Sequence, residues 1–176
     1  MNTETDSLLR RLTARQAGPH RLRQPVAIIG PGDGGLTECD AARAVAHALA
    51  TAGMTIVCGG RGGVMEAASR GCAEAGGTAI GLLPEEDAKA ANAWLSIVMP
   101  TGIGEMRNAL IARCGLCLIA IGGGIGTVSE MAFGLKWGKP VFVLHGDVLL
   151  EGCVSVSDVD AMLAAAARFL ADIPIL

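Results

Sequence analysis

Glycine is gathered in clusters at intervals along this chain, and this spacing constrains the fold more than any other feature of the sequence. The 176 residues include 25 glycines, about twice the usual share of ~7%. The clusters lie at residues 30–35, 59–63, 76–81 and 122–126. Because they recur between segments of regular pattern, they indicate tight turns repeated in one architecture and not a flexible linker.

Short apolar runs alternate with segments of helical periodicity between these clusters. Each run is continuously apolar, which is typical of strands covered on both faces of a parallel sheet, and strands that alternate with helices indicate βαβ units. We therefore predict a single-domain, Rossmann-like three-layer α/β/α fold with a mostly parallel sheet over residues 25–176, after a charged N-terminal leader at residues 1–24. The predicted strands are 25–29, 54–58, 78–83, 95–99, 116–121 and 140–144, and the predicted helices include 104–114 and 126–137.

The bulk composition excludes several classes of protein. Hydrophobic residues make up 51% and charged residues 18% of the chain, whereas a disordered chain has low hydrophobicity and high net charge. No apolar run approaches the ~20 residues of a membrane span, and the mixed charges at the N-terminus do not resemble a secretory signal. The net charge of −3 and the 3% aromatic content argue against a nucleic-acid partner.

The six cysteines indicate a reducing compartment and no chemistry of their own. Most of them lie within apolar runs, as small buried hydrophobic residues do, so we expect the protein in the cytoplasm. Cys114 and Cys117 have C-x-x-C spacing, but a zinc site needs a second pair or histidines at suitable spacing, which the sequence lacks. We therefore predict no metal site.

The strongest candidate motif runs from Ile121 to Glu130, directly between an apolar strand and an amphipathic helix. Its glycines leave backbone N–H groups free to turn toward an anion at the positive end of the helix, and Thr127 offers a hydroxyl to the same anion. It matches neither the Walker A loop nor the dinucleotide fingerprint. Two alternatives stay open here: the glycines serve tight packing alone, or Glu130 caps the helix through Thr127-x-x-Glu130 spacing and does not face a ligand.

Two further turns belong to the same predicted edge of the sheet. The segment 59–66 is a second candidate anion site, in which Arg61 could reach a phosphate and Glu66 is either functional or a surface acid favoured by the helix dipole. Arg107 starts a helix, where a cation is unfavourable unless a ligand phosphate or an acidic partner such as Glu130 lies close. Ligands of such sheets bind outside the carboxyl ends of the strands, where all of these turns, and the one that begins at Gly30, should meet.

These residues resemble a known superfamily. The segment 122–130 is similar to the Pro-Gly-Gly-x-Gly-Thr-x-x-Glu motif of the LOG family, once labelled "lysine decarboxylase-like". The segments Gly59-Gly-Arg-Gly-Gly-Val-Met-Glu66 and Met106-Arg107-Asn108 resemble more closely its molybdenum-cofactor carrier-like branch. The resemblance covers roughly residues 24–145. LOG enzymes hydrolyse nucleoside 5′-monophosphates to base and ribose 5-phosphate, which implies catalytic roles for Arg107 and Glu130, with the carboxylate next to an oxocarbenium-like ribose.

Three positions depart from the LOG pattern and favour the carrier-like branch. Gly122 stands where LOG enzymes have proline, Asn108 where they have lysine and Gly104 where they have methionine. The loss of the lysine removes a positive charge near the site, whereas the phosphate turn is retained. The ligand that the carrier-like branch implies is the phosphorylated pterin of molybdenum cofactor.

Three functions therefore remain open at this point. They are a binding or carrier protein for an AMP-like nucleotide or molybdenum cofactor, with no further cofactor required; a nucleoside monophosphate phosphoribohydrolase; and a DNA-handling protein, which the charge disfavours. The resemblance also implies a homodimer or higher homo-oligomer, to which the helix 126–137 could contribute. The short apolar runs argue against a membrane partner. The predicted binding residues are Gly30, Gly59, Gly60, Arg61, Gly62, Gly63, Asn108, Gly122, Gly123, Gly124, Gly126 and Thr127, and the predicted catalytic residues are Arg107 and Glu130.

Overall fold

The computed structural model, which describes residues 2–174, has a seven-stranded sheet in which every pair of neighbouring strands is parallel. The strand order is β4-β3-β2-β1-β5-β6-β7. The prediction of a Rossmann-like α/β fold is confirmed, and the sheet is entirely parallel where a mostly parallel one was expected. The strands are β1 (Val26–Ile29), β2 (Ile56–Cys58), β3 (Ala79–Leu83), β4 (Ile97–Pro100), β5 (Leu118–Ile121), β6 (Val141–Leu144) and β7 (Val154–Ser155).

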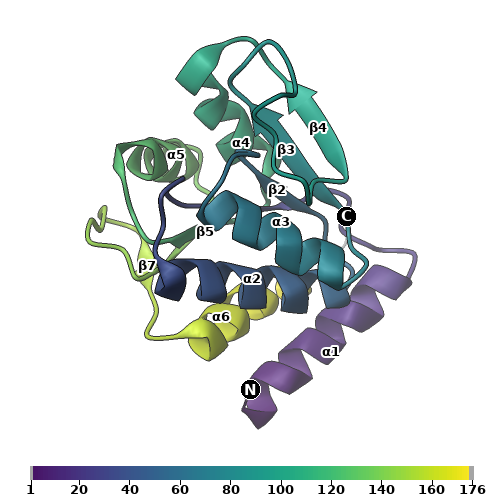
Figure 1. The fold of residues 1–176 in the computed structure, drawn as a ribbon. Coiled ribbons are helices and arrows are strands. Elements are labelled where there is room, and N and C mark those ends of the chain that lie inside the picture. The colour runs from purple at the N-terminus through teal and green to yellow at the C-terminus, as the bar shows by residue number, and fades with distance from the viewer. Residues whose placement is uncertain (1, 175–176) are drawn as a thin grey trace.

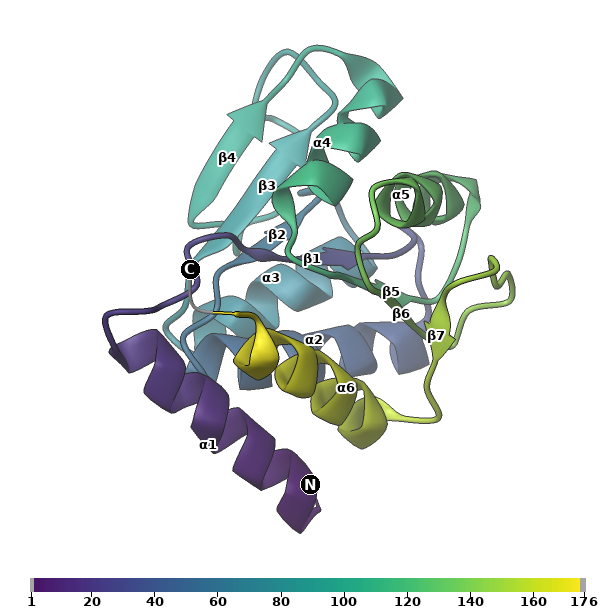
Figure 2. The ribbon, with the colours of Figure 1, turned by 180° about the vertical axis from the view of Figure 1, so that it is seen from behind.

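Helices cover both faces of the sheet, but unequally (Figures 1 and 2). Along β1, Val26 and Ile28 pack into the larger core with α1, α2, α3 and α6, while Ala27 and Ile29 pack on the other face with α4 and α5. This two-residue alternation explains why the strand is apolar throughout. The helices are α1 (Thr3–Ala17), α2 (Leu36–Thr51), α3 (Val64–Glu74), α4 (Asn108–Cys114), α5 (Ile125–Lys136), α6 (Val159–Asp172) and the 3₁₀ helix η1 (Gly104–Arg107).

The charged leader contains an amphipathic helix that packs on the domain. Leu8 and Leu12 of α1 are buried in the core cluster that also holds residues of α2 and α6. At the start of α1, Thr5 donates a hydrogen bond to the carboxylate of Asp160 in α6, with 3.1 Å between the oxygens. The leader therefore contributes apolar surface to the core. No helix within residues 2–174 is long and apolar enough to cross a membrane.

The predicted helix over 104–114 is divided into two parts. Residues Gly104–Arg107 form η1, and α4 begins at Asn108. Two backbone hydrogen bonds hold the segment that leads into η1. The N–H of Gly102 donates to the carbonyl of Glu85, and the N–H of Gly104 donates to the carbonyl of Pro84. Both of these glycines have positive φ, which produces the tight entry from which a short 3₁₀ turn starts. The division places Arg107 at the junction of η1 and α4.

The strand order reverses direction between β1 and β5. From β1 the chain builds the sheet toward β4 on one side, and from β5 it builds toward β7 on the other. The helices that follow these two strands, α2 and α5, therefore lie on opposite faces and leave a crevice at the carboxyl ends of the strands. This is the position at which open parallel sheets bind ligands.

Candidate functional site

A cavity of about 280 Å³ lies in this crevice. The turns after β1, β2 and β5 form its walls, together with η1 and the first residue of α4. Eight of the predicted site residues meet here, although they come from four separate stretches of the sequence. The cavity is lined by Gly30, Pro31, Gly32, Asp33, Arg61, Met65, Glu105, Arg107, Asn108, Gly124, Gly126, Thr127 and Glu130.

The first turn of α5 presents uncapped backbone amides to the cavity. Gly124 is the N-cap and supplies no side-chain cap. Its carbonyl accepts the hydrogen bond of Val128 N, at 2.9 Å, so the amides of the three residues between them have no acceptor within the helix. Because Gly126 and Thr127 line the cavity, this positive end of the helix can receive an anion there.

Arg107 and Glu130 form a buried ion pair next to these amides. Arg107 Nη1 lies 3.5 Å from Glu130 Oε1, and the two residues are only 4% and 6% exposed. The same nitrogen donates to the side-chain oxygen of Asn108, at 2.9 Å. The Nε of Arg107 is buried and has no hydrogen-bond partner among the residues described. An acidic partner for Arg107 was one of the sequence-based expectations, and the structure provides it.

Burial changes the acidity of both groups. It raises the pKa of Glu130 to about 8, although the Arg107 charge acts in the opposite direction, and Glu105 adds to the increase. Burial likewise lowers the pKa of Arg107, and the charge of Glu130 opposes this effect. A carboxyl group that titrates near neutral pH can give or take a proton in a reaction.

Glu130 does not cap α5. A capping box would require Thr127 at the N-cap, but the N-cap is Gly124, and Glu130 lies well inside the helix. Its side chain is directed to Arg107 instead. The sequence left open whether Glu130 caps the helix or faces a ligand. In the structure it does not cap α5, and it lines the cavity. Glu66, the other acid considered, is exposed on α3.

The clustered glycines fall into two groups. Some allow close backbone contacts: a Cβ on Gly30 would lie 2.4 Å from the carbonyl oxygen of Ile121, and Gly63 has a φ of +61° beside the Gly32 backbone. Others face open space, since a Cβ on Gly124 meets nothing within 4 Å and one on Gly126 meets only an amide nitrogen at 3.9 Å. Packing explains the first group and leaves the second without a structural reason. The predicted residues that do not line the cavity are Gly59, Gly60, Gly62, Gly63, Gly122 and Gly123.

Arg61 and Asn108 reach the cavity with their side chains partly engaged. Arg61 donates from Nε to Glu85 Oε1, at 2.9 Å, and its guanidinium lies between this acid and Glu105. Asn108 donates to the hydroxyl of Ser129 in α5, at 2.9 Å. The asparagine that replaces the lysine of the LOG pattern therefore joins α4 to α5.

The sequence motifs missed five of the lining residues. Asp33 and its neighbours Pro31 and Gly32 lie in the first glycine turn, of which only Gly30 was singled out. Met65 and Glu105 sit beside motif residues that were named. Position within a recognised turn is the signal that could have found Asp33 and Glu105, whereas nothing local distinguishes Met65 from a core residue.

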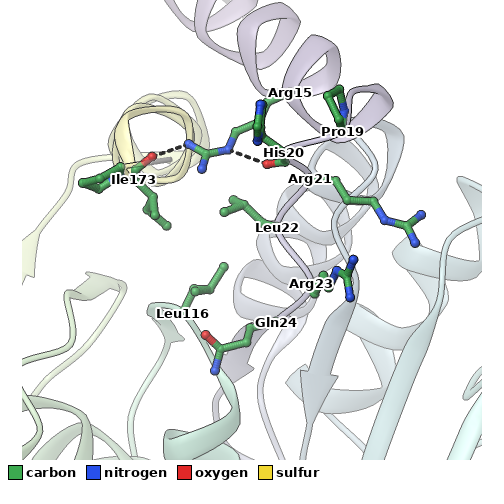
Figure 3. A pocket seen from close by; sticks show the side chains of 10 residues that line it. Arg15, Pro19, His20, Arg21, Leu22, Arg23, Gln24, Leu116 and Ile173 are labelled. Carbon is green, nitrogen blue, oxygen red and sulfur yellow. Dashed lines mark hydrogen bonds between the residues drawn. The ribbon is translucent and has the colours of Figure 1, made fainter. Parts of the chain in front are cut away.

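Another hollow lies at the opposite, amino-terminal edge of the sheet (Figure 3). It includes Leu22, Leu116 and Arg15, whose guanidinium donates to the carbonyl of Ile173 at 2.6 Å and to that of His20 at 3.4 Å. The same guanidinium group also bonds to the last carbonyls of α6. Arg15 thus closes the end of a helix, which is a structural role.

The six cysteines are free. Cys58, Cys72 and Cys117 are buried, and Cys114 is partly buried. Within residues 2–174, no group of three or more His, Cys, Asp or Glu side chains is placed to hold a metal ion. The charged side chains that line the cavity are two arginines and three acids.

The chain is similar to several known proteins. A cytokinin riboside 5′-monophosphate phosphoribohydrolase, LOG5 of Arabidopsis thaliana, is 33% identical over 124 residues, 64% of this chain and 54% of the plant protein, so the match spans about half of that enzyme. An uncharacterized protein of Archaeoglobus fulgidus is 37% identical over 132 residues, which cover 72% of this chain and 83% of that protein.

Solved structures extend the comparison. The molybdenum cofactor binding protein of Rippkaea orientalis has a TM-score of 0.80 and 31% identity, and covers 85% of this chain and 99% of its own. The Moco carrier protein of Chlamydomonas reinhardtii has a TM-score of 0.77 and 32% identity, and covers 86% of this chain and all of its own. The model of the SLOG cluster4 family matches residues 23–168. This chain therefore belongs to the SLOG cluster4 family, within the LOG-like superfamily.

Proposed function

We propose that the cavity binds a small phosphorylated ligand, either nucleotide-like or the pterin of molybdenum cofactor, and that the protein acts as a binding or carrier protein. The phosphate lies at the first turn of α5, against the amides beside Gly124 and Gly126. Arg107 carries the proposal. Its buried Nε has no partner among the described residues, and an unpaired buried donor costs about 1–3 kcal/mol, which a ligand oxygen would recover.

The remaining donors and acceptors of the cavity suit the rest of such a ligand. Asp33 and Glu105 line the cavity together with Arg61. The carboxylate of Asp33 accepts hydrogen bonds from ribose hydroxyls or from the N–H groups of a pterin ring. The molybdenum-cofactor binding and carrier proteins with the same fold support the pterin, since they are more than 30% identical to this chain.

The second candidate function is a phosphoribohydrolase that acts on nucleoside 5′-monophosphates. One observation favours it: the pKa of Glu130 is raised to about 8 by burial. A carboxyl group of this kind can protonate a leaving base or stabilise a developing ribosyl cation. The similarity to the plant phosphoribohydrolase adds support. The asparagine at position 108 argues against this reaction, because the LOG pattern has a positive charge there.

An assay with purified protein separates the two functions. The protein is incubated with AMP and related monophosphates, and free base is measured beside the wild type in Arg107→Ala, Glu130→Ala and Arg10→Ala. The hydrolase is established if wild type and Arg10→Ala release free base and both Arg107→Ala and Glu130→Ala do not. Binding without turnover, or pterin fluorescence that copurifies with the protein, supports the carrier. The absence of both binding and turnover overturns the proposal.

We also propose that the chain forms a homo-oligomer in the cytoplasm, without a nucleic-acid partner. The sheet face that carries α4 and α5 leaves large apolar side chains exposed, and Phe133 stacks on Trp137 with 5.3 Å between ring centroids. Arg113 lies 4.0 Å above the Trp137 ring. Aromatic and arginine side chains of this kind are typical of interface centres. Light scattering of wild type and Leu110→Glu tests this: a monomeric wild type overturns it. The exposed apolar residues of this face are Ile97, Met99, Ile103, Met106, Leu110, Ile125 and Phe133.

A further inference from the structure

The loop between β3 and β4 forms hydrogen bonds to the turn that contains Arg61. Asn92 of this loop donates from its backbone N to the carbonyl of Gly60, at 2.9 Å. Its side-chain amide donates to the carbonyls of Gly60 and Arg61, both at 3.1 Å, and to the hydroxyl of Ser69, at 3.3 Å. The backbone of Arg61 is therefore held in place by residues that do not line the cavity.

The side chain of Arg61 contacts two carboxylates in different ways. Glu85 Oε1 accepts from both Nε and Nη2 of Arg61, and the guanidinium holds the pKa of Glu85 below its usual value. On the other side, Nη1 is 3.7 Å from Glu105 Oε1, beyond hydrogen-bond distance. The side chain of Glu85 is 29% exposed and that of Glu105 is 69% exposed. Of the two acids, only Glu105 lines the cavity.

We propose that Glu85 is a positioning residue, which holds one edge of the Arg61 guanidinium so that Nη1 faces the cavity, and that Glu105 occupies the place of the ligand's anion. This inference rests on the proposed function and extends it by assigning Arg61 a role in binding the ligand's anion. Glu85 acts through Arg61 and does not itself contact the ligand.

Glu85 and Glu105 act on Arg61 in different ways. A planar guanidinium fixed along one edge loses little further freedom when an anion binds at the other end, so the ligand gains affinity from this preorganisation. Glu105 is exposed and lies at a distance where an ion pair contributes little, so a phosphate displaces it at small cost. Its negative charge nevertheless opposes the ligand's charge while both are near Arg61.

Three isosteric variants that each remove one negative charge test the proposal. The probe is AMP, and its dissociation constant is measured by calorimetry for wild type, Glu85→Gln, Glu105→Gln and Glu86→Gln. We expect Glu85→Gln to weaken binding about 5–20-fold through lost preorganisation and Glu105→Gln to strengthen it about 2–5-fold. Glu86→Gln, an exposed neighbour of Glu85, should change it little. If Glu85→Gln strengthens binding as Glu105→Gln does, Glu85 acts only through its charge and the proposal is overturned.

A measurement without ligand separates this proposal from the proposed function. In wild type, the NMR signal of the Arg61 Nε–H should exchange slowly with water compared with that of the exposed Arg10, and Glu85→Gln should remove the difference while Glu105→Gln retains it. Equal exchange rates in wild type overturn the positioning role, whatever the ligand. Should wild type fail to bind AMP or a pterin while Arg61 keeps its Glu85-dependent protection, the proposed function fails and the positioning arrangement stands. If Glu85→Gln does not fold, the same exchange measurement is made on Glu105→Gln and Asn92→Ala. Protection of the Arg61 Nε–H that Glu105→Gln retains and Asn92→Ala loses shows that the loop holds Arg61.

Discussion

The guanidinium of Arg107 and the carboxylate of Glu130 lie 3.5 Å apart where solvent scarcely reaches them. One comes from the end of η1 and the other from the second turn of α5. Burying two charges is costly even when they are paired, and here one donor of the pair has no partner in the described chain. An arrangement of this cost is typical of a functional site.

The raised pKa of Glu130 predicts a pH-dependent stability. Between the ordinary value of 4.5 and the folded value of about 8, the folded state holds a proton that the unfolded state releases. The free energy of unfolding therefore falls as pH rises through this window, by up to about 1.4 kcal/mol per pH unit. Urea denaturation from pH 5 to pH 9 should give a flatter profile for Glu130→Gln. Glu86→Gln serves as the control with the wild-type slope, and parallel profiles for all three proteins would contradict the pKa shift.

The coupling between the two residues should also depend on pH. A double-mutant cycle with Arg107→Met and Glu130→Gln isolates their interaction in the free energy of unfolding. Above the pKa of Glu130 we expect a favourable coupling of about 1–3 kcal/mol. At pH 6, where the carboxyl group is mostly protonated, the coupling should shrink. A coupling that is the same at pH 6 and pH 9 would show that Glu130 is ionised throughout.

The variant Gly126→Ala should raise the stability of the protein and weaken its binding of AMP. A methyl group there meets open space apart from one amide nitrogen at 3.9 Å, so Gly126→Ala should stabilise α5 by up to about 1 kcal/mol while it crowds the proposed phosphate position and weakens AMP binding. The matched comparison is Gly63→Ala, where φ is +61° and the new Cβ would lie 2.5 Å from the Gly32 backbone. That variant should lose at least about 2 kcal/mol. Thermal melts and calorimetry measure both, and unchanged binding in Gly126→Ala would move the phosphate elsewhere.

Arg15 is expected to affect stability alone. It donates to carbonyls at the end of α6, including that of Ile173 (Figure 3). Removing these bonds in Arg15→Ala should lower the free energy of unfolding by about 1–2 kcal/mol. Because this hollow is at the opposite edge of the sheet, AMP affinity should match the wild type. Arg10→Ala, an exposed arginine of the same helix, is the control, and a large change in AMP affinity would indicate that the two edges are coupled.

The local sequence determined the strands, the tight turns and the segments that form the site. An apolar run followed by glycine specifies a buried strand and a tight turn from neighbouring residues alone, and all strands of a parallel sheet end at one edge. For that reason the sequence located the segments around Gly124 and Arg107 and could anticipate an acidic partner such as Glu130.

Only the tertiary structure decided which of these residues act together and in what state. Gly63 and Gly124 look alike in the sequence, but one lies against a distant backbone segment and the other borders open space. The raised pKa of Glu130 likewise depends on segments that are remote in sequence. The same is true of the hydrogen bond between Glu85 and Arg61. Desolvation and charge interactions are sums over everything nearby in space, and the fold alone determines what is nearby.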